Sequence, residues 1–338
     1  MMKKRGGLLA AMAAAALAVS ACTAPTADPS ASAGGAAGEC PADALCKVGN
    51  VVKPKDGKTY KIGVSFPVLD QFLQTVADGM KARAAEAGVE LSIVSAQERT
   101  DVQLNNVQNF IAANVDAMIV IPQDTQATDP ITQKAQEAKI PLVYVNRRPA
   151  NLPNTIPYVG SDSLYAGQVE MEALAKLVGN KGNVAILQGD PSQEAAILRT
   201  KGCKETAEKL GMQVIREQAG LWARDKGLQI AENWIQSGDK IDVICSNNDE
   251  MALGAINAYK KAGKLDTVKI GGVDATKDAL AAMKAGELPV TVFQDAKGQG
   301  YGGVDAAVQL ANGGKVAATL DVPYVLVTPD NMAEFENR

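Results

Sequence analysis

The feature that most constrains the fold is a regular alternation of two kinds of segment along the chain. Short runs rich in Val and Ile are followed by longer segments whose apolar residues recur at helical spacing, such as 72–87 and 104–113. Such alternation predicts parallel sheets with crossover helices on both faces, and almost continuously apolar strands are typical of such sheets. The expected fold class is therefore α/β. The runs predicted as strands are Lys61–Phe66, Val89–Ser95, Ala117–Ile121, Leu142–Asn146, Asn183–Gln188, Gln213–Arg216, Val243–Ser246, Val268–Val273 and Val290–Gln294.

The N-terminus has the pattern of an export signal. Basic residues at positions 3–5 precede an apolar run over 8–19 and small residues before Cys22. A transmembrane helix is not favoured, because the apolar run is shorter than the ~20 residues needed to cross a bilayer. The pattern resembles a bacterial lipobox. We therefore expect residues 1–21 to be removed and Cys22 to be acylated, which would anchor the exported protein to the outer face of the cytoplasmic membrane, at the cell surface or in the periplasm.

The segment after Cys22 is rich in Ala, Pro, Ser, Thr and Gly up to about residue 38 and has little to bury. Such a composition is typical of a flexible tether. We expect the tether to span residues 22–57 and order to begin near Lys58. About ten strands in the remaining chain suit two similar α/β units, with 157–163 as a crossing between them.

Composition excludes several function classes. The net charge is -4, so no basic field indicates nucleic-acid binding. Histidine is absent, which removes Ser-His-Asp machinery, the commonest general base and imidazole metal sites. We therefore predict neither a metal site nor a cofactor. Cys40 and Cys46 could form a local disulfide, whereas Cys203 and Cys245 could pair or remain buried thiols.

Polar and aromatic residues follow the carboxyl ends of successive predicted strands. Open parallel sheets bind ligands at the carboxyl ends of their strands. Asp249 and Asp274 could each be simple helix N-caps, but the whole set is harder to explain in that way. Carboxylates, amides and guanidinium groups engage neighbouring hydroxyls, and aromatic rings cover C–H faces, so the set fits a polyol. The residues at or just beyond the strand ends are Asp70, Phe72, Asn146, Arg147, Arg148, Arg199, Trp222, Asn247, Asn248, Asp249, Asp274 and Gln294.

These motifs resemble the ribose/galactose-type sugar-binding proteins of bacterial ABC importers. The resemblance spans about Lys61 to Thr328, and its most specific element is Asn-Asp-Glu-Met-Ala-Leu-Gly at 248–254. It also includes Asp-Gln-Phe at 70–72, Val-Asn-Arg at 145–147, Arg-Thr-Lys-Gly at 199–202, Gly-Val-Asp at 272–274 and Val-Phe-Gln at 292–294. The resemblance implies the periplasmic-binding-protein type I fold, with two doubly wound parallel-sheet lobes joined by a three-segment hinge. The implied N-terminal lobe is 58–161 plus 295–321, and the implied C-terminal lobe is 162–294 plus 322–338.

The same resemblance implies which residues hold the ligand. The chain departs from the ribose binders of the family, which usually carry Asn at the position of Asp70, Asp at that of Asn146, and Phe at those of Leu73 and Trp222. These departures argue against ribose and favour a six-membered polyol, a hexose or a cyclitol such as myo-inositol. The implied ligand-binding residues are Asp70, Phe72, Leu73, Asn146, Arg147, Arg199, Trp222, Asn248, Asp274 and Gln294.

The predicted function is that of a monomeric substrate-binding lipoprotein, not an enzyme. It would close over one sugar or cyclitol by hinge motion and deliver it to a membrane permease. A sensor that presents its ligand to a membrane signalling receptor is the first alternative. A transcription regulator is not favoured, because no basic helix-turn-helix precedes the first strand. A glycoside hydrolase could use Asp70, Asp249 and Asp274, but we expect Arg147 and Arg199 to keep such carboxylates ionised.

One glycine motif is a decoy. Gly298, Gly300 and Gly303 satisfy the spacing of a dinucleotide-binding fingerprint. That fingerprint also needs an acidic residue at the end of the next strand. Asp321 precedes the predicted strand 322–327, so it would lie at the wrong end. We interpret these glycines as close packing at a helix start and predict no NAD site.

Overall fold

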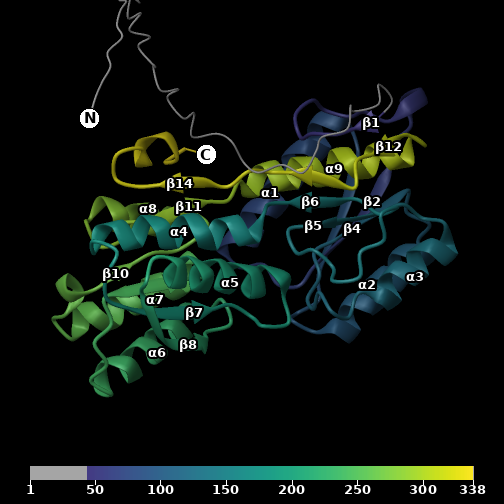
Figure 1. Ribbon diagram of the computed structural model, residues 1–338. Coiled ribbons are helices and arrows are strands. Elements are labelled where there is room, and N and C mark those ends of the chain that lie inside the picture. The colour runs from purple at the N-terminus through teal and green to yellow at the C-terminus, as the bar shows by residue number, and fades with distance from the viewer. Residues whose placement is uncertain (1–43, 338) are drawn as a thin grey trace, which may run out of the picture. The chain divides into compact units, whose positions relative to one another are not determined.

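The computed structural model describes residues 44–337. The predicted signal peptide, the acylation site at Cys22, the tether up to residue 43 and Cys40 lie outside this range. Within it, no helix is both long enough and apolar enough to cross a lipid bilayer. The predicted α/β class is confirmed, since helices and mostly parallel strands alternate along the chain (Figure 1).

A six-stranded parallel sheet forms the first lobe, in the order β13-β6-β5-β4-β2-β3. Alternate side chains of its strands enter two different cores: Ile119 and Val143 pack with α1 and α9, whereas Met118 and Tyr144 pack with α2 and α3. Both faces of the sheet are therefore covered, which explains the continuous apolar runs. The elements are β2 Lys61–Phe66, α1 Gln71–Ala87, β3 Glu90–Ser95, α2 Thr100–Ala112, β4 Ala117–Val120, α3 Asp129–Ala138, β5 Leu142–Val145, β6 Tyr158–Gly160, α9 Ala296–Ala311 and β13 Thr319–Asp321.

The second lobe contains a four-stranded parallel sheet in the order β10-β9-β7-β8. One face packs against α4 and α5 and the other against α6, α7 and α8. A short antiparallel pair, β11 with β14, adjoins this sheet through bridges at Gly271 and Asp274. The elements are α4 Ser163–Leu177, β7 Asn183–Gln188, α5 Glu194–Lys209, β8 Gln213–Ala219, α6 Arg224–Gln236, β9 Val243–Ser246, α7 Asp249–Lys261, η2 Leu265–Thr267, β10 Lys269–Ile270, α8 Lys277–Lys284, β11 Thr291–Phe293, β14 Val325–Val327 and η3 Met332–Glu334.

The chain passes between the two sheets three times: from β6 to α4, from β11 to α9, and from β13 to β14. These three crossings support the proposed division of the chain into two lobes. Because both sheets are parallel, the carboxyl ends of the strands in each sheet gather at one edge. Side chains that follow the strands in sequence are thereby placed together in space.

Strand prediction was wrong near the third crossing. Residues 322–327 were expected to form one strand, but β13 ends at Asp321 and β14 begins only at Val325. Asp321 therefore does lie at the carboxyl end of a strand. The dinucleotide hypothesis fails for another reason, since a side chain on Gly300 of α9 would place Cβ 2.5 Å from the Val76 carbonyl oxygen of α1. Gly300 therefore serves close packing of α9 against α1, as the sequence indicated.

Order begins earlier than the expected Lys58. Residues 44–58, which we call the N-terminal strap, lie on the first lobe: β1 (Ala44–Leu45) pairs with β12 (Lys315–Val316), and η1 spans Lys55–Gly57. The Val52 amide donates to the buried Asp305 carboxylate at 3.0 Å, and the Arg83 guanidinium donates to the Gly49 carbonyl at 3.0 Å. The part of the chain that packs on the lobe is therefore longer than composition suggested.

Two cysteines of the second lobe form a disulfide. Cys203 of α5 and Cys245 of β9 are fully buried and bonded to each other. Of the two alternatives that the sequence allowed, a disulfide or two buried thiols, the disulfide is therefore confirmed. The bond links the helix that carries Arg199 to the strand that leads to Asn248. Cys46 is also disulfide-bonded, but its predicted partner Cys40 lies outside the described residues.

Candidate functional site

All ten side chains predicted to bind ligand line one cavity between the two lobes. The empty space among them is about 520 Å³, including the part open to solvent. Four further residues complete the lining. The full set is Asp70, Phe72, Leu73, Asn146, Arg147, Gln193, Ala195, Arg199, Trp222, Asn248, Glu250, Asp274, Thr276 and Gln294.

The first lobe contributes residues from the ends of β2 and β5. Asp70 is the N-cap of α1: one carboxylate oxygen accepts from the Leu73 amide at 2.7 Å. Asn146 has a positive φ of 65°, a conformation that Asn tolerates better than most residues, and its side chain donates to Gln299 at 2.9 Å. This backbone turn directs the next side chain, Arg147, into the cavity wall. Among residues 44–337, one hydrogen bond holds its guanidinium, to the Pro122 carbonyl at 3.0 Å.

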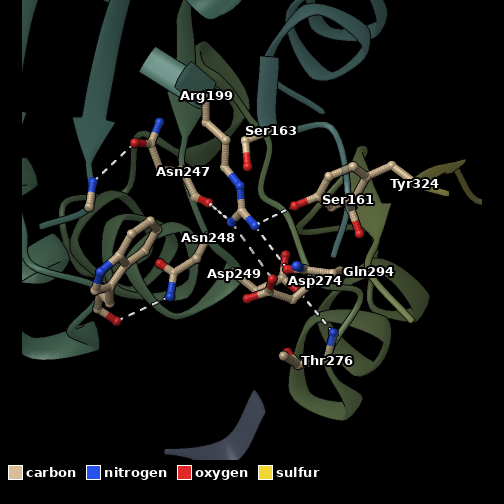
Figure 2. A network of polar contacts seen from close by, with 12 residues as sticks. Ser161, Ser163, Arg199, Asn247, Asn248, Asp249, Asp274, Thr276, Gln294 and Tyr324 are labelled. Carbon is tan, nitrogen blue, oxygen red and sulfur yellow. Dashed lines mark hydrogen bonds and ion pairs between the residues drawn. The ribbon is translucent and has the colours of Figure 1, made fainter. Parts of the chain in front are cut away.

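Arg199 is the centre of the polar network of the second lobe (Figure 2). Its guanidinium donates to the carbonyl of Asn247 at 2.6 Å, to the side chain of Gln294 at 2.9 Å and to the hydroxyl of Tyr324 at 2.6 Å. These partners come from the end of β9 and from two of the crossings. With 4% of its surface exposed, Arg199 joins the floor of the cavity to the segments that must bend if the lobes move.

Asn248 and Trp222 line the second-lobe wall together. Asn248 is the N-cap of α7, accepting from the Met251 amide at 3.1 Å, and its side-chain amide donates to the Trp222 carbonyl at 3.2 Å. Trp222 has a φ of 68°, and its ring lies so close to Gly189 that a Cβ there would be 2.2 Å from it. A glycine at that position is therefore required for the indole to cover the strand end.

Asp274 corrects one expectation about charge. Its carboxylate lies 3.8 Å from the Arg199 guanidinium, yet burial raises the pKa of Asp274 well above its ordinary value, and Arg199 only partly opposes this. The two arginines were expected to keep the carboxylates ionised, but at Asp274 removal from water opposes the ionised form more strongly than one long ion pair supports it. The case against a hydrolase therefore does not rest on the charge of these carboxylates.

Three residues at the strand ends do not line the cavity: Asp249 and Asn247 lie beneath it, and Arg148 lies outside it. Asp249 is fully buried below the lining, where it accepts from the Thr276 amide at 2.8 Å and the Thr291 hydroxyl at 2.7 Å. Burial raises the pKa of Asp249 to about 7. Asn248 is the N-cap of α7, so the alternative that Asp249 is a simple helix N-cap is wrong. Asn247 is also buried, and Arg148 turns away to donate to Thr319 at 3.0 Å.

Sequence reasoning missed Gln193, Glu250 and Thr276. Glu250 belongs to the motif at 248–254, which offered a signal, and Arg224 holds its carboxylate with contacts of 2.8 and 2.7 Å. Thr276 caps α8 and follows Asp274 by two residues. Gln193 lies five residues beyond the end of β7 in an irregular turn, and none of the motifs that carry the resemblance includes it.

Among the residues that the structure describes, one group has its potential metal ligands close together, namely Glu170, Cys203 and Cys245. Both sulfur atoms are used in the disulfide, so neither is available as a thiolate ligand. Glu170 instead accepts from the Ser246 amide at 2.9 Å. This group therefore serves the second-lobe core.

Comparisons with known proteins agree with this architecture. A family model described as a periplasmic binding protein domain matches residues 62–315. A Rhizobium meliloti protein assigned to rhizopine binding is 44% identical over 286 residues, which cover 82% of this chain and 93% of that protein. A xylitol-binding protein of Mycolicibacterium smegmatis is 33% identical over 291 residues, which cover 85% of this chain and 82% of that protein.

A solved structure extends the likeness to three dimensions. It is an ABC transporter solute binding protein from Bacillus halodurans with bound myo-inositol. The two chains are 44% identical, with a TM-score of 0.81 over 84% of this chain and 99% of the other. Sequence and fold are thus shared over most of the described residues.

Proposed function

Because this chain belongs to the periplasmic binding protein family, as a sugar-binding protein of the ABC-importer type, we propose that its ligand is a six-membered polyol, myo-inositol or a hexose. It holds this ligand between its two lobes and delivers it to a membrane permease. Like its relatives it is a binding protein and not an enzyme.

The observation that carries the proposal is the convergence of hydroxyl-binding groups from both lobes on one cavity. Asp70 and Arg147 approach from the first lobe, and Asn248 and Asp274 from the second. Each hydroxyl of a polyol both donates and accepts, so it needs neighbours of both kinds. A buried hydroxyl left without a partner costs about 1–3 kcal/mol, so such a lining selects one arrangement of hydroxyls against others.

The size and type of the apolar lining favour a six-membered ring. Trp222 offers a broad aromatic surface, and Phe72 lies on the lobe opposite it. Leu73 is smaller than the aromatic residue that ribose binders of the family usually carry at its position, which leaves more room in the cavity. Myo-inositol, the ligand of the Bacillus halodurans protein, is a six-membered ring with a hydroxyl on every carbon. It would use the donors and acceptors on both walls at once.

Export and anchoring complete the proposal. The basic and apolar segments before Cys22 support removal of residues 1–21 and acylation of the new N-terminus. The protein then works outside the cytoplasmic membrane, where it meets its permease. Mass spectrometry of the membrane fraction tests this part: a diacylated Cys22 is expected, and a mature chain that begins elsewhere would contradict it.

A thermal-shift panel of pentoses, hexoses and inositols tests ligand identity. A ligand that binds only the folded state at 100 times its Kd adds about 2.7 kcal/mol of stability, which raises Tm by several degrees. We expect the largest rise with myo-inositol or a hexose. A larger rise with a pentose would refute the six-membered ring, and no rise with any polyol would refute sugar binding. The ligand recovered after denaturation should be chemically unchanged, as NMR would verify.

A further inference from the structure

The two lobes meet at a small seam of hydrogen bonds beside the ligand cavity, which we call the closure seam (residues 123–125 of the first lobe and 192–194 of the second). Thr125 is its centre and is completely buried. Its hydroxyl donates to the Ser192 carbonyl at 2.9 Å and accepts from the Glu194 amide at 3.2 Å, and its own amide also donates to the Ser192 carbonyl at 3.2 Å.

Gln193 extends this seam into the cavity. Its amide nitrogen donates to the Gln123 carbonyl of the first lobe and to the Asp190 carboxylate, both at 3.2 Å. Its amide oxygen accepts from the indole N–H of Trp222 at 2.8 Å. The carbonyl and the carboxylate accept only, and the indole donates only, so the amide has a single orientation that satisfies all three.

Trp222 needs such support because its backbone adopts a conformation that is unfavourable for residues other than glycine. It follows Leu221, and both residues have positive φ values, 54° and 68°. Neither residue tolerates that conformation as glycine does, so surrounding contacts must hold the turn. The Trp222 carbonyl is fixed by Asn248 within the same lobe, whereas among the described residues the indole N–H donates to Gln193 alone.

We propose that Gln193 is a positioning residue that couples lobe closure to the orientation of Trp222. When the lobes separate, the side chain of Gln193 loses its first-lobe acceptor and the seam around Thr125 opens. The indole ring then loses its fixed orientation over the cavity. When the lobes close, the same bonds set the ring against the ligand. This inference rests on the proposed function only where it concerns ligand affinity.

The two tryptophans of the chain make the coupling measurable. Trp234 is buried in the second-lobe core, so a Trp234→Phe background leaves Trp222 as the sole indole fluorophore. In this background we compare acrylamide quenching of Gln193→Ala and Thr125→Val with that of the parent, each saturated with the polyol that gives the largest thermal shift, because the lobes are closed in that state. Thr125→Val removes the hydroxyl bonds at nearly constant volume and changes no residue that contacts the indole. Gln133→Ala, an exposed glutamine bonded to Glu137 at 2.9 Å, is the matched control.

The expected result is at least a twofold rise in the quenching constant in both seam variants and none in the control. A rise in Gln193→Ala alone would overturn the coupling, because local support of the ring would then be sufficient. No rise in either variant would overturn the positioning role as well. Circular dichroism and thermal melts identify a variant that has lost its fold, and the other variant then decides the question.

The ligand arm uses myo-inositol and isothermal titration calorimetry. Both seam variants should raise its Kd about tenfold, mainly through faster dissociation, while Gln133→Ala stays within twofold of the parent. Unchanged affinity alongside raised quenching would overturn the link to the ligand. If the parent itself does not bind myo-inositol, the proposed ligand is wrong, whereas the quenching comparison with another bound polyol still tests the seam.

Discussion

Replacing Arg147 by Met should change ligand affinity and protein stability in opposite directions. Arg147 is 7% exposed, donates one bond to the Pro122 carbonyl and lines the cavity. A side chain retained for structure would lower stability when removed. One retained for the ligand should lower affinity instead. The two quantities are measured separately, so the variant distinguishes these roles.

The magnitudes follow from the surroundings of the guanidinium. Burial lowers the pKa of Arg147 to about 10, although Asp70 opposes this, so the folded state disfavours the charged form by about 3 kcal/mol. Removing the charge recovers that amount, and losing the bond to Pro122 costs about 1.5–3 kcal/mol. The ligand-free variant should therefore be as stable as the parent or about 1–2 kcal/mol more stable.

Binding should respond in the other direction. Two charge-assisted hydrogen bonds to ligand hydroxyls contribute about 3–5 kcal/mol in total, so Kd should rise between about 100-fold and 5,000-fold. Calorimetry with myo-inositol and urea unfolding without ligand measure the two quantities. Arg148→Met, which changes the neighbouring arginine outside the cavity lining, is the control. Affinity within threefold of the parent, or a ligand-free loss above 2 kcal/mol, would refute the reasoning.

Three further predictions concern stability. Burial raises the pKa of Glu194 from 4.5 to about 7, so the folded state binds more protons than the unfolded state between these pH values. The Tm of the ligand-free protein should therefore fall as pH rises from 5 to 8. In scanning calorimetry, Glu194→Gln should reduce this dependence of Tm on pH. Replacing Cys203 and Cys245 together by Ala should lower the free energy of unfolding by about 4 kcal/mol in the chain-entropy model for 42 residues of separation, and a reductant-insensitive urea midpoint in the parent would contradict this. Gly300→Ala should lower the free energy of unfolding by about 1–3 kcal/mol through overpacking. Gly49→Ala, where a Cβ meets nothing within 4 Å, should have the same Tm as the parent in a thermal melt.

The rule that parallel sheets place the carboxyl ends of their strands at one edge predicted most of the cavity residues, whereas the full ligand-binding set, with Leu73, came from the resemblance to the sugar-binding proteins. That rule is local: it needs only the position of each strand, and strands such as β2, β7 and β9 carry a clear apolar signal. Gln193 escaped it because its role depends on a carbonyl of the other lobe, seventy residues earlier in the chain. The pairing of β1 with β12 likewise joins two-residue strands at opposite ends of the described chain, for which no local pattern exists.

The raised pKa of Asp274 shows a different limit. A sequence places Arg199 and Asp274 in one site and so suggests an ionised pair. It does not give the depth of burial or the 3.8 Å separation of the charged groups, and these decide which effect is larger. Signs of pKa shifts in a closed cavity therefore require coordinates, even where the residues themselves are predictable.

The N-terminal strap has a mechanical consequence. Any force applied to the chain upstream of Ala44 reaches the body of the protein through β12, Asp305 and the α9 end of the first lobe. None of the three connecting segments lies along that path. A protein held at its N-terminus can thus move its second lobe relative to the first without load on the connecting segments.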